Sequence, residues 1–445
     1  MSSHDPKFKL VVAFDFGTTY SGYAFSFRDF PLHIKTNCGW SDGADGLVTM
    51  KAPTCLLMTP EDEFHSFGYE AENKYSSLAA EDKHRGWLLF RRFKMLLHNT
   101  EHLNRKTTVT DINGVSRPAI KIFTMAIRYL KHHFITNVFQ QPEIGTFLSE
   151  RDIKYVLTVP AIWSSNSKHF MREAAVEAGL EDRQLKLCLE PEAASIWCLS
   201  ITKSIGNVEH FTGVPFMVID LGGGTADIYV NEKKDDHTFK ELYKAGGGPW
   251  GGKAVDENFV KWLMGLLGET VMNKFKEEHM CEYFDMLRNF EMAKRSFSAD
   301  TTGLVSFKLS KILLQLFDEN SDSDLRTIIS ESNLDGFVEF KDDHISVDSS
   351  IVATWFLEPI SQMIEYVKTI LARPDLSKVE NILVVGGFSE SKFVHDELNE
   401  KLKDKTITIP QDPGLAVVRG AVRFGQLPTI VSSRVVKAVP NFKLQ

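Results

Sequence analysis

Apolar residues along the chain follow two patterns, and each pattern predicts a different kind of element. Continuous apolar runs, such as those at 10–16 and 153–159, are typical of strands that are buried on both faces. Longer segments in which apolar residues recur every three or four positions predict amphipathic helices, the clearest at 117–139. Strands and helices alternate along the chain, which predicts an α/β protein.

The same two patterns place the other elements. Strand–turn–strand hairpins are expected at 10–25 and 216–230. Further strands are expected at 185–189, 304–307 and 381–385. Helices are expected at 69–98, 164–179, 193–199, 253–276, 280–298, 351–372, 391–403 and 414–424. The segment 25–67 is rich in turns, and 203–213 is predicted to be a linker. In the helix at 117–139, the side chains of 131–133 are predicted to lie on the solvated face.

The two hairpins carry the same chemistry nearly half a chain apart. Asp15 ends an apolar strand before the turn Gly-Thr-Thr at 17–19, and Asp220 ends another before the triple glycine at 222–224. Glycine turns let backbone N–H groups approach phosphate oxygens, and two facing carboxylates suit hydrated Mg²⁺. The alternatives are an Asp15 that bonds only to its own turn and a triple glycine that is merely flexible. The repeat predicts two similar α/β halves that share a cleft.

Two further segments could surround a base and a ribose. The pair at 386–387 is Gly-Gly between an apolar strand and a helix, a junction that lets a ligand approach the backbone. Glu291, Lys294 and Arg295 share one helix face, where they could hold ribose hydroxyls and stack on a purine. The alternative for these three residues is a set of ion pairs within the helix.

Two charged residues suggest hydrolysis of a phosphate. Glu190 stands at the end of a strand, where its carboxylate could orient a water molecule against a terminal phosphate. Lys94 could neutralise the negative charge that develops there. Each residue alone is more typical of a protein surface. Their interpretation as catalytic residues therefore depends on the phosphate-binding hairpins.

Composition narrows the classes of function. The net charge of −8 and the lack of a long basic run argue against a nucleic-acid partner. No apolar run reaches the length of a membrane span. The five cysteines are widely spread, which is typical of free thiols in a reducing compartment. A location in the cytoplasm or the nucleus is expected, and the cytoplasm is favoured. The acidic segment 318–324 lacks the glycine of a calcium loop and is expected to be solvated.

The order of these motifs resembles the nucleotide-binding domain of the 70-kDa heat-shock proteins, in the superfamily of actin and hexokinase. DFGTTYSGYAF and VIDLGGGTADI match the two phosphate motifs, and FEMAKRSFS and ILVVGGFSESKFV match the adenosine contacts. TVPAIWSSNSKHFMREAAVEAGL and LCLEPEAASIW match the first connecting segment. The variants LEPEAASIW and GGGPWGG are most similar to the divergent 12A/12B-like subgroup of the family. The resemblance covers roughly residues 8–425.

This resemblance implies the actin-like ATPase fold, with two lobes that each have a ribonuclease-H-like core and a nucleotide in the central cleft. Lobe I would comprise 8–212 and return with 411–425, and lobe II would comprise 213–410. The tail at 426–445 is shorter than the roughly 100 residues that a peptide-binding domain needs, so no such domain is expected in it.

The resemblance also implies a ligand and its contacts. ATP or ADP with Mg²⁺ is expected, and Asp15 and Asp220 would hold the ion through water. The residues expected around the nucleotide are Asp15, Gly17, Thr18, Thr19, Tyr20, Gly222, Gly223, Gly224, Thr225, Asp227, Gly248, Glu291, Lys294, Arg295, Ser298, Gly386, Gly387 and Phe388.

A catalytic group follows from the same comparison. Glu190 would orient the attacking water, Lys94 would be the essential lysine, and Asp220 would act with them. Arg91 and Arg92 are alternatives to Lys94 if the local alignment shifts.

Several positions depart from the family pattern. The arginine that stacks on the base in the family is Glu390 here, and a usual aspartate near the end is Gly414. Pro160, with Lys168 in place of a family arginine, would lie on the path that couples the nucleotide to the rest of a chaperone. The departures at 390 and 414 predict weaker or differently selective binding at the adenine end.

Three functions are compatible with these residues. The first is a slowly hydrolysing ATPase that acts as a nucleotide switch in chaperone-like or stress-related work. The second is an ATP-binding scaffold for unidentified protein partners, with little or no hydrolysis. The third, a sugar-kinase-like phosphotransferase, is disfavoured because the chain has no matching motif for a sugar pocket.

Overall fold

The computed structural model describes residues 8–37, 39–41, 48–100, 103–139, 148–204, 212–234, 238–427 and 431–433. The chain start, the centre of the loop at 39–46, most of the linker at 203–213 and most of the tail at 426–445 therefore lie outside the described residues.

The first large sheet has six strands: β1 (Leu10–Phe16), β2 (Tyr20–Phe27), β3 (Lys35–Thr36), β6 (Ala52–Pro53), β12 (Ile153–Val159) and β13 (Leu185–Leu189). Their order is β13-β12-β1-β2-β3, and β6 also pairs with β2. β1 runs parallel to β12 and antiparallel to β2. β1 and β12 are buried along their whole length, which explains their almost continuous apolar sequence.

The second large sheet repeats this pairing pattern. Its strands are β14 (Pro215–Leu221), β15 (Ala226–Lys233), β16 (Phe239–Gly248), β20 (Asn381–Val385), β21 (Thr406–Thr408) and β22 (Val431–Ser433). The order is β21-β20-β14-β15-β16-β22, with β14 parallel to β20 and antiparallel to β15. Both predicted hairpins are confirmed. In each sheet the first strand of the hairpin pairs antiparallel with the second strand and parallel with a later strand. We call β1/β2 the first hairpin and β14/β15 the second hairpin.

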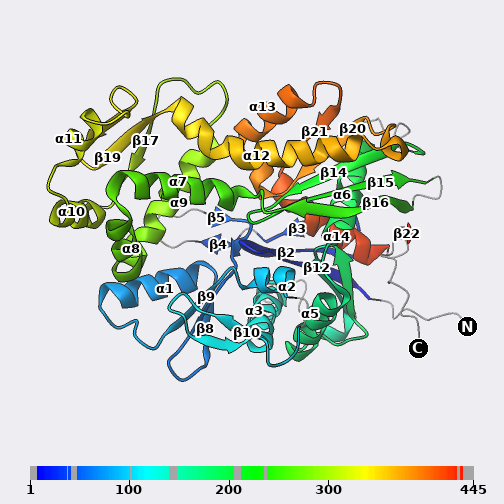
Figure 1. Cartoon of the computed structure of the whole chain (residues 1–445). Coiled ribbons are helices and arrows are strands. Elements are labelled where there is room, and N and C mark those ends of the chain that lie inside the picture. Colours follow the sequence, from blue (N-terminus) through cyan, green and yellow to red (C-terminus); the bar gives the residue numbers. More distant parts are fainter. Residues whose placement is uncertain are drawn as a thin grey trace, which may run out of the picture.

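Helices and smaller sheets surround the large sheets (Figure 1). The helices are α1 (Tyr69–Ala80), α2 (Leu96–Asn99), α3 (Ala119–Phe139), α5 (Ser165–Glu177), α6 (Glu190–Ser204), α7 (Gly252–Leu267), α8 (Glu269–Glu278), α9 (Met280–Ser296), α10 (Lys311–Asn320), α11 (Leu325–Ser330), α12 (Ser349–Leu371), α13 (Lys392–Lys401) and α14 (Ala416–Gln426). The small sheets comprise β4 (Trp40–Ser41) with β5 (Val48–Thr49), β7 (Cys55–Met58) with β8 (Phe64–Phe67) and β9 (Leu88–Arg91), β10 (Thr108–Thr110) with β11 (Ser116–Pro118), and β17 (Leu304–Lys308) with β18 (Val338–Lys341) and β19 (His344–Asp348). None of the helices in the described part of the chain is long and apolar enough to span a bilayer.

The predicted helix at 69–98 is wrong in its second half. Helix α1 ends at Ala80, Leu88–Arg91 forms strand β9, which pairs with β7, and the chain is helical again only from Phe93. Asp82 and Gly86 both have positive φ angles, so the chain leaves the helical path after α1. Residues 88–90 are then all buried, as in a strand covered on both faces.

Most other predicted elements are confirmed with small changes of boundary. The helix predicted at 253–276 is divided into α7 and α8 at Gly268, whose φ angle is +92°. The cysteine prediction is confirmed for four residues, because Cys55, Cys188, Cys198 and Cys281 are free thiols.

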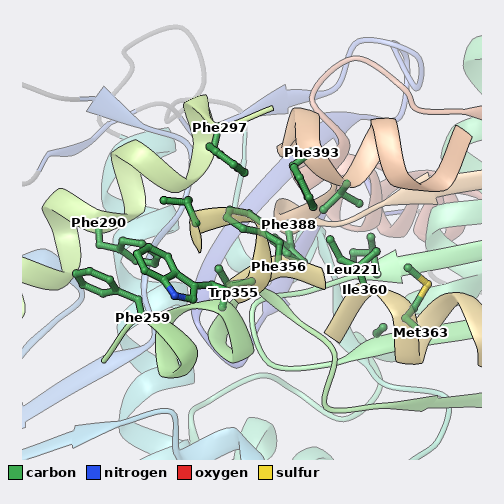
Figure 2. Packing of buried hydrophobic residues seen from close by; sticks show 14 of the residues in the cluster. Leu221, Phe259, Phe290, Phe297, Trp355, Phe356, Ile360, Met363, Phe388 and Phe393 are labelled. Carbon is green, nitrogen blue, oxygen red and sulfur yellow. The ribbon is translucent and has the colours of Figure 1, made fainter. Parts of the chain in front are cut away.

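An aromatic cluster fixes the helices beside the second sheet (Figure 2). The rings of Phe259 on α7 and Phe290 on α9 stack at 4.0 Å, and Trp355 on α12 packs edge-on against both. Such pairs contribute about 0.5–1.5 kcal/mol beyond their buried area. The cluster therefore fixes the orientation of α9, which carries Arg295 at its end.

The predicted solvated face of α3 is wrong for His133. Its ring stacks on Trp40 at 4.1 Å, and its Nδ1 atom lies 3.1 Å from the Tyr23 hydroxyl. Burial, with a smaller effect of His132, lowers the pKa of His133 to about 4. Helical periodicity misses this contact because Trp40 belongs to a distant segment of the chain.

The position of His133 predicts acid sensitivity. Its pKa of about 4 in the folded protein lies below the ordinary value of 6.5, so the unfolded chain binds more protons between these values. Stability contributed by neutral His133 is therefore present above pH 6.5 and is lost as the pH falls toward 4. We expect the melting temperature of the native chain to fall more between pH 7.5 and 5 than that of His133→Gln. Parallel melting curves for the two proteins would contradict this prediction.

Helices α6 and α14 connect the two large sheets. Apolar residues of both helices form one buried cluster with Val11 and Val156 of the first sheet and Phe216 of the second. The helices approach so closely at Gly420 that an added Cβ would lie 1.7 Å from the Ala193 carbonyl oxygen. This crossing positions the first residue of α6, Glu190.

Gly420→Ala is expected to destabilise the fold. The added methyl group meets a helix backbone that cannot rotate away, and overpacking of this kind typically costs about 1–3 kcal/mol. Urea unfolding would measure the change in free energy. The matched control is Gly265→Ala in α7, where a Cβ meets no atom within 4 Å and helix propensity predicts a gain of up to about 1 kcal/mol. An equal response of both variants would contradict the proposed close contact.

Candidate functional site

A cavity of about 410 Å³ lies where the turns of the two hairpins meet. A Cβ on Gly223 would lie 2.2 Å from Thr19 Oγ1, so the turn of the second hairpin packs directly on that of the first. Only glycine allows such an approach between backbone and side chain. The contact brings the two segments with repeated motifs to the same cavity.

Most of the residues singled out in the sequence line this cavity. They are Asp15, Gly17, Thr18, Thr19, Tyr20, Lys94, Pro160, Glu190, Asp220, Gly222, Gly223, Gly224, Thr225, Asp227, Arg295, Gly386, Gly387, Glu390 and Gly414. The other expected contacts do not line it, and these are Gly248, Glu291, Lys294, Ser298 and Phe388. Their role as direct ligand contacts remains a prediction.

The residues outside the lining have other partners. Lys294 Nζ lies 2.6 Å from an Asp256 oxygen, and Glu291 pairs with both Lys294 and Arg295. The ion pairs within the helix, which were the alternative interpretation of this segment, are thus present. Phe388 is buried in the apolar cluster of the second sheet. Only Arg295 of the charged set reaches the cavity.

Lys94 and Glu190 form a buried ion pair at the cavity. The Lys94 ammonium donates to Glu190 Oε1 at 2.8 Å. Lys94 follows β9 and a left-handed residue, Arg92, which turns the chain toward the cavity. Arg91 instead pairs with Glu72 at 2.7 Å, so neither alternative to Lys94 lines the cavity. Burial and the charge of Asp15 raise the pKa of Glu190, while Lys94 opposes the rise.

The second hairpin contributes two carboxylates that lie opposite each other in register. Asp220 of β14 faces Asp227 of β15, and both are buried. Burial, together with the charge of Glu190, raises the pKa of Asp227 to about 7 and that of Asp220 well above its usual range. The Asp227 Oδ1 atom has no hydrogen-bond partner within the described part of the chain. Buried carboxylate oxygens in this state suit a hydrated divalent cation.

The first hairpin differs, because its carboxylate already has a cation. Lys51 Nζ lies 2.6 Å from Asp15 Oδ2, and the Thr158 hydroxyl donates to Oδ1 at 2.9 Å. Burial would raise the pKa of Asp15, but the Lys51 ammonium outweighs this effect and lowers it. Sequence reasoning missed Lys51 and Thr158, since a single lysine or threonine far from a motif gives no local signal.

The two family departures lie side by side at the other end of the cavity. A Cβ on Gly414 would lie 3.0 Å from Glu390 Oε1. The Glu390 carboxylate therefore occupies the space next to a position where the family usually has an aspartate. Its other oxygen lies 3.5 Å from Arg295 Nη1. An acidic group is retained at this end, but it comes from a different residue.

Comparisons with known proteins show the family of this chain. Residues 134–427 match the family model of the Hsp70 protein. Human heat shock 70 kDa protein 12B is 34% identical over 96% of this chain and 70% of its own length. Mouse heat shock 70 kDa protein 12A is 33% identical over 97% of this chain and 71% of its own length. The chloroplastic stromal 70 kDa heat shock-related protein of Pisum sativum is 26% identical over 98% of this chain and 55% of its own length.

The chain belongs to the Hsp70 family. The predicted resemblance to this family and to its 12A/12B-like subgroup is confirmed. Family membership implies an actin-like ATPase fold and a nucleotide-binding Hsp70-like domain, and the α/β architecture with mixed sheets agrees with both.

Proposed function

We propose that the cavity binds ATP or ADP with Mg²⁺ and hydrolyses ATP slowly, so that the bound nucleotide switches the conformation of the protein. The observation that carries this proposal is the buried Lys94–Glu190 pair, placed in one cavity with the carboxylates of the second hairpin. A folded protein maintains such a costly group of buried charges most readily where it serves a reaction.

The residues of this chain suit phosphoryl transfer. The glycine turns at 17–19 and 222–224 would offer backbone N–H groups to phosphate oxygens. The Glu190 carboxylate would orient the attacking water, and Lys94 would balance the negative charge that develops on the terminal phosphate. The raised pKa of Glu190 suits a group that accepts a proton from water.

The carboxylates Asp220 and Asp227, together with Asp15, would hold the hydrated Mg²⁺ ion. When bound, this ion would neutralise phosphate charge and so ease the departure of the leaving group. The orphaned, buried Oδ1 atom of Asp227 supports the assignment.

We extend the proposal to the architecture. Each six-stranded sheet with its helices would be the ribonuclease-H-like core of one lobe, with lobe I at 8–212 and 411–425 and lobe II at 213–410. The repeated strand pairing supports this division, and the crossing of α6 and α14 between the sheets is the natural hinge for lobe closure. A chaperone-like or stress-related role in the cytoplasm would follow from such a switch, and the free thiols favour that compartment.

A second function is favoured by one observation. The Arg295–Glu390 pair occupies the end of the cavity where the base would bind. A ligand that must separate this pair binds more weakly. Weak binding suits a scaffold that responds to bound ATP but hydrolyses it little or not at all. In that case unidentified protein partners would recognise the nucleotide-bound form.

Glu190→Gln and Lys94→Met are expected to lower ATP turnover by at least about 100-fold, because they remove the water-orienting carboxylate and the balancing cation. Isothermal titration with ATP, ADP and Mg²⁺, paired with phosphate release from the same sample, would separate binding from hydrolysis. Glu365→Gln on the exposed face of α12 is the matched control. Unchanged phosphate release in both variants would exclude the hydrolytic role and favour the scaffold.

Glu390→Arg is expected to tighten ATP binding by about threefold to tenfold. The substitution removes the carboxylate that pairs with Arg295 and adds a second guanidinium plane, whose cation–π contact with a purine contributes roughly 1 kcal/mol. Titration with ATP and with tripolyphosphate would test this, since only ATP carries a base. Equal gains for both ligands would mean that the base does not bind between positions 295 and 390.

A further inference from the structure

Lys51 lines the cavity, but neither the motifs nor the proposed reaction uses it. Its ammonium lies 2.6 Å from Asp15 Oδ2 and lines the cavity. The two side chains are only 20% and 8% exposed. Because Thr158 donates to the other oxygen of Asp15, both carboxylate oxygens already have partners from the protein.

The fold provides a specific place for this lysine. Asp15 lies opposite Gly22 in the register of the first hairpin. A Cβ on Gly22 would lie 2.9 Å from Lys51 Cγ and 3.0 Å from the Met50 carbonyl oxygen. The stem of Lys51 therefore crosses the bare backbone of Gly22 to reach Asp15. Pairing of β6 with β2, with Ala52 opposite Ser21, holds the segment in position.

The charges around the cavity are distributed unevenly between the two hairpins. Lys94 pairs with Glu190, and Lys51 pairs with Asp15. Among the described residues, no lysine or arginine forms an ion pair with Asp220 or the facing Asp227 of the second hairpin. The second hairpin therefore lacks a cation from these residues, whereas the first hairpin has one in Lys51.

An ammonium group has three N–H donors. One of them is directed at Asp15, and Lys51 forms no second ion pair with a described residue, so two donors can serve an anionic group in the cavity. Charge-assisted hydrogen bonds of this kind to phosphate are about twice as strong as neutral ones.

We propose that Lys51 is a built-in cation of the nucleotide site, which joins Asp15 to the phosphates and makes nucleotide binding only partly dependent on Mg²⁺. This inference rests on the proposed function. Removal of the Lys51 charge would leave Asp15 to repel the phosphates unless a metal ion compensates. The dependence of affinity on Mg²⁺ should consequently increase when Lys51 is replaced.

The experiment is calorimetric titration of ADP and ATP in excess Mg²⁺ and in EDTA. On removal of Mg²⁺, the affinity of the native chain is expected to fall by less than about tenfold. For Lys51→Met, this fold-loss of affinity is expected to be at least about tenfold larger than for the native chain. Methionine keeps the unbranched stem that packs over Gly22. Lys51→Arg should behave like the native chain because it keeps the charge. Lys368→Met, on the exposed face of α12, is the control for net charge.

The outcomes separate this inference from the proposed function. If the native chain binds nucleotide in Mg²⁺ but not at all in EDTA, or if Lys51→Met shows the native ratio of affinities, the inference is overturned and the proposed function stands. If the native chain binds neither nucleotide in any condition, the proposed function fails. If Lys51→Met does not fold, the melting temperature of the native chain is measured in EDTA with and without ADP. A higher melting temperature with ADP supports the inference, and an unchanged melting temperature overturns it.

Discussion

Burial of like charges in one cavity is the constraint on which the rest of this structure depends. Six carboxylates line the cavity, and four of them are buried: Asp15, Glu190, Asp220 and Asp227. Two lysines pair with only two of these four. Transfer of a charged carboxylate out of water costs several kcal/mol unless a cation pairs with it or a proton neutralises it. Asp220 and Asp227 respond with raised pKa values, so the site is poised to bind a cation or protons.

Two contacts of the fold hold the buried carboxylates around the cavity: the one between the hairpin turns and the one between α6 and α14. The two hairpin turns meet at Gly223 and Thr19, which brings the carboxylates of both hairpins to one cavity. The crossing of α6 and α14 joins the sheets that carry the hairpins, and Glu190 begins α6 directly after β13. The acidic side chains thus come from strands β1, β14 and β15 and from the start of α6. Lys51 lies between the short strands β5 and β6, and the buried Lys94 lies in a 3-10 helix (Phe93–Met95) that follows β9.

Sequence patterns predicted those parts of the fold that depend on local order. Both hairpins, the helix at 119–139 and the glycine turns of the site are visible as periodicity or as motifs. The patterns failed where a distant segment decides the outcome. Residues 88–91 could be helix or strand until β7 pairs with them, and His133 looks solvated until Trp40 covers it. Lys51 stands 36 positions from its carboxylate partner, so no local spacing could indicate the pair.

The contact between Glu390 and Gly414 has an evolutionary consequence. The resemblance implies an aspartate at 414 and an arginine at 390, and this chain has a glycine and a glutamate there. Restoring the aspartate alone would place two carboxylates in contact, since even a Cβ at 414 lies 3.0 Å from Glu390 Oε1. The side chains that positions 390 and 414 can carry are therefore coupled, because a carboxylate at one position limits what the other can hold.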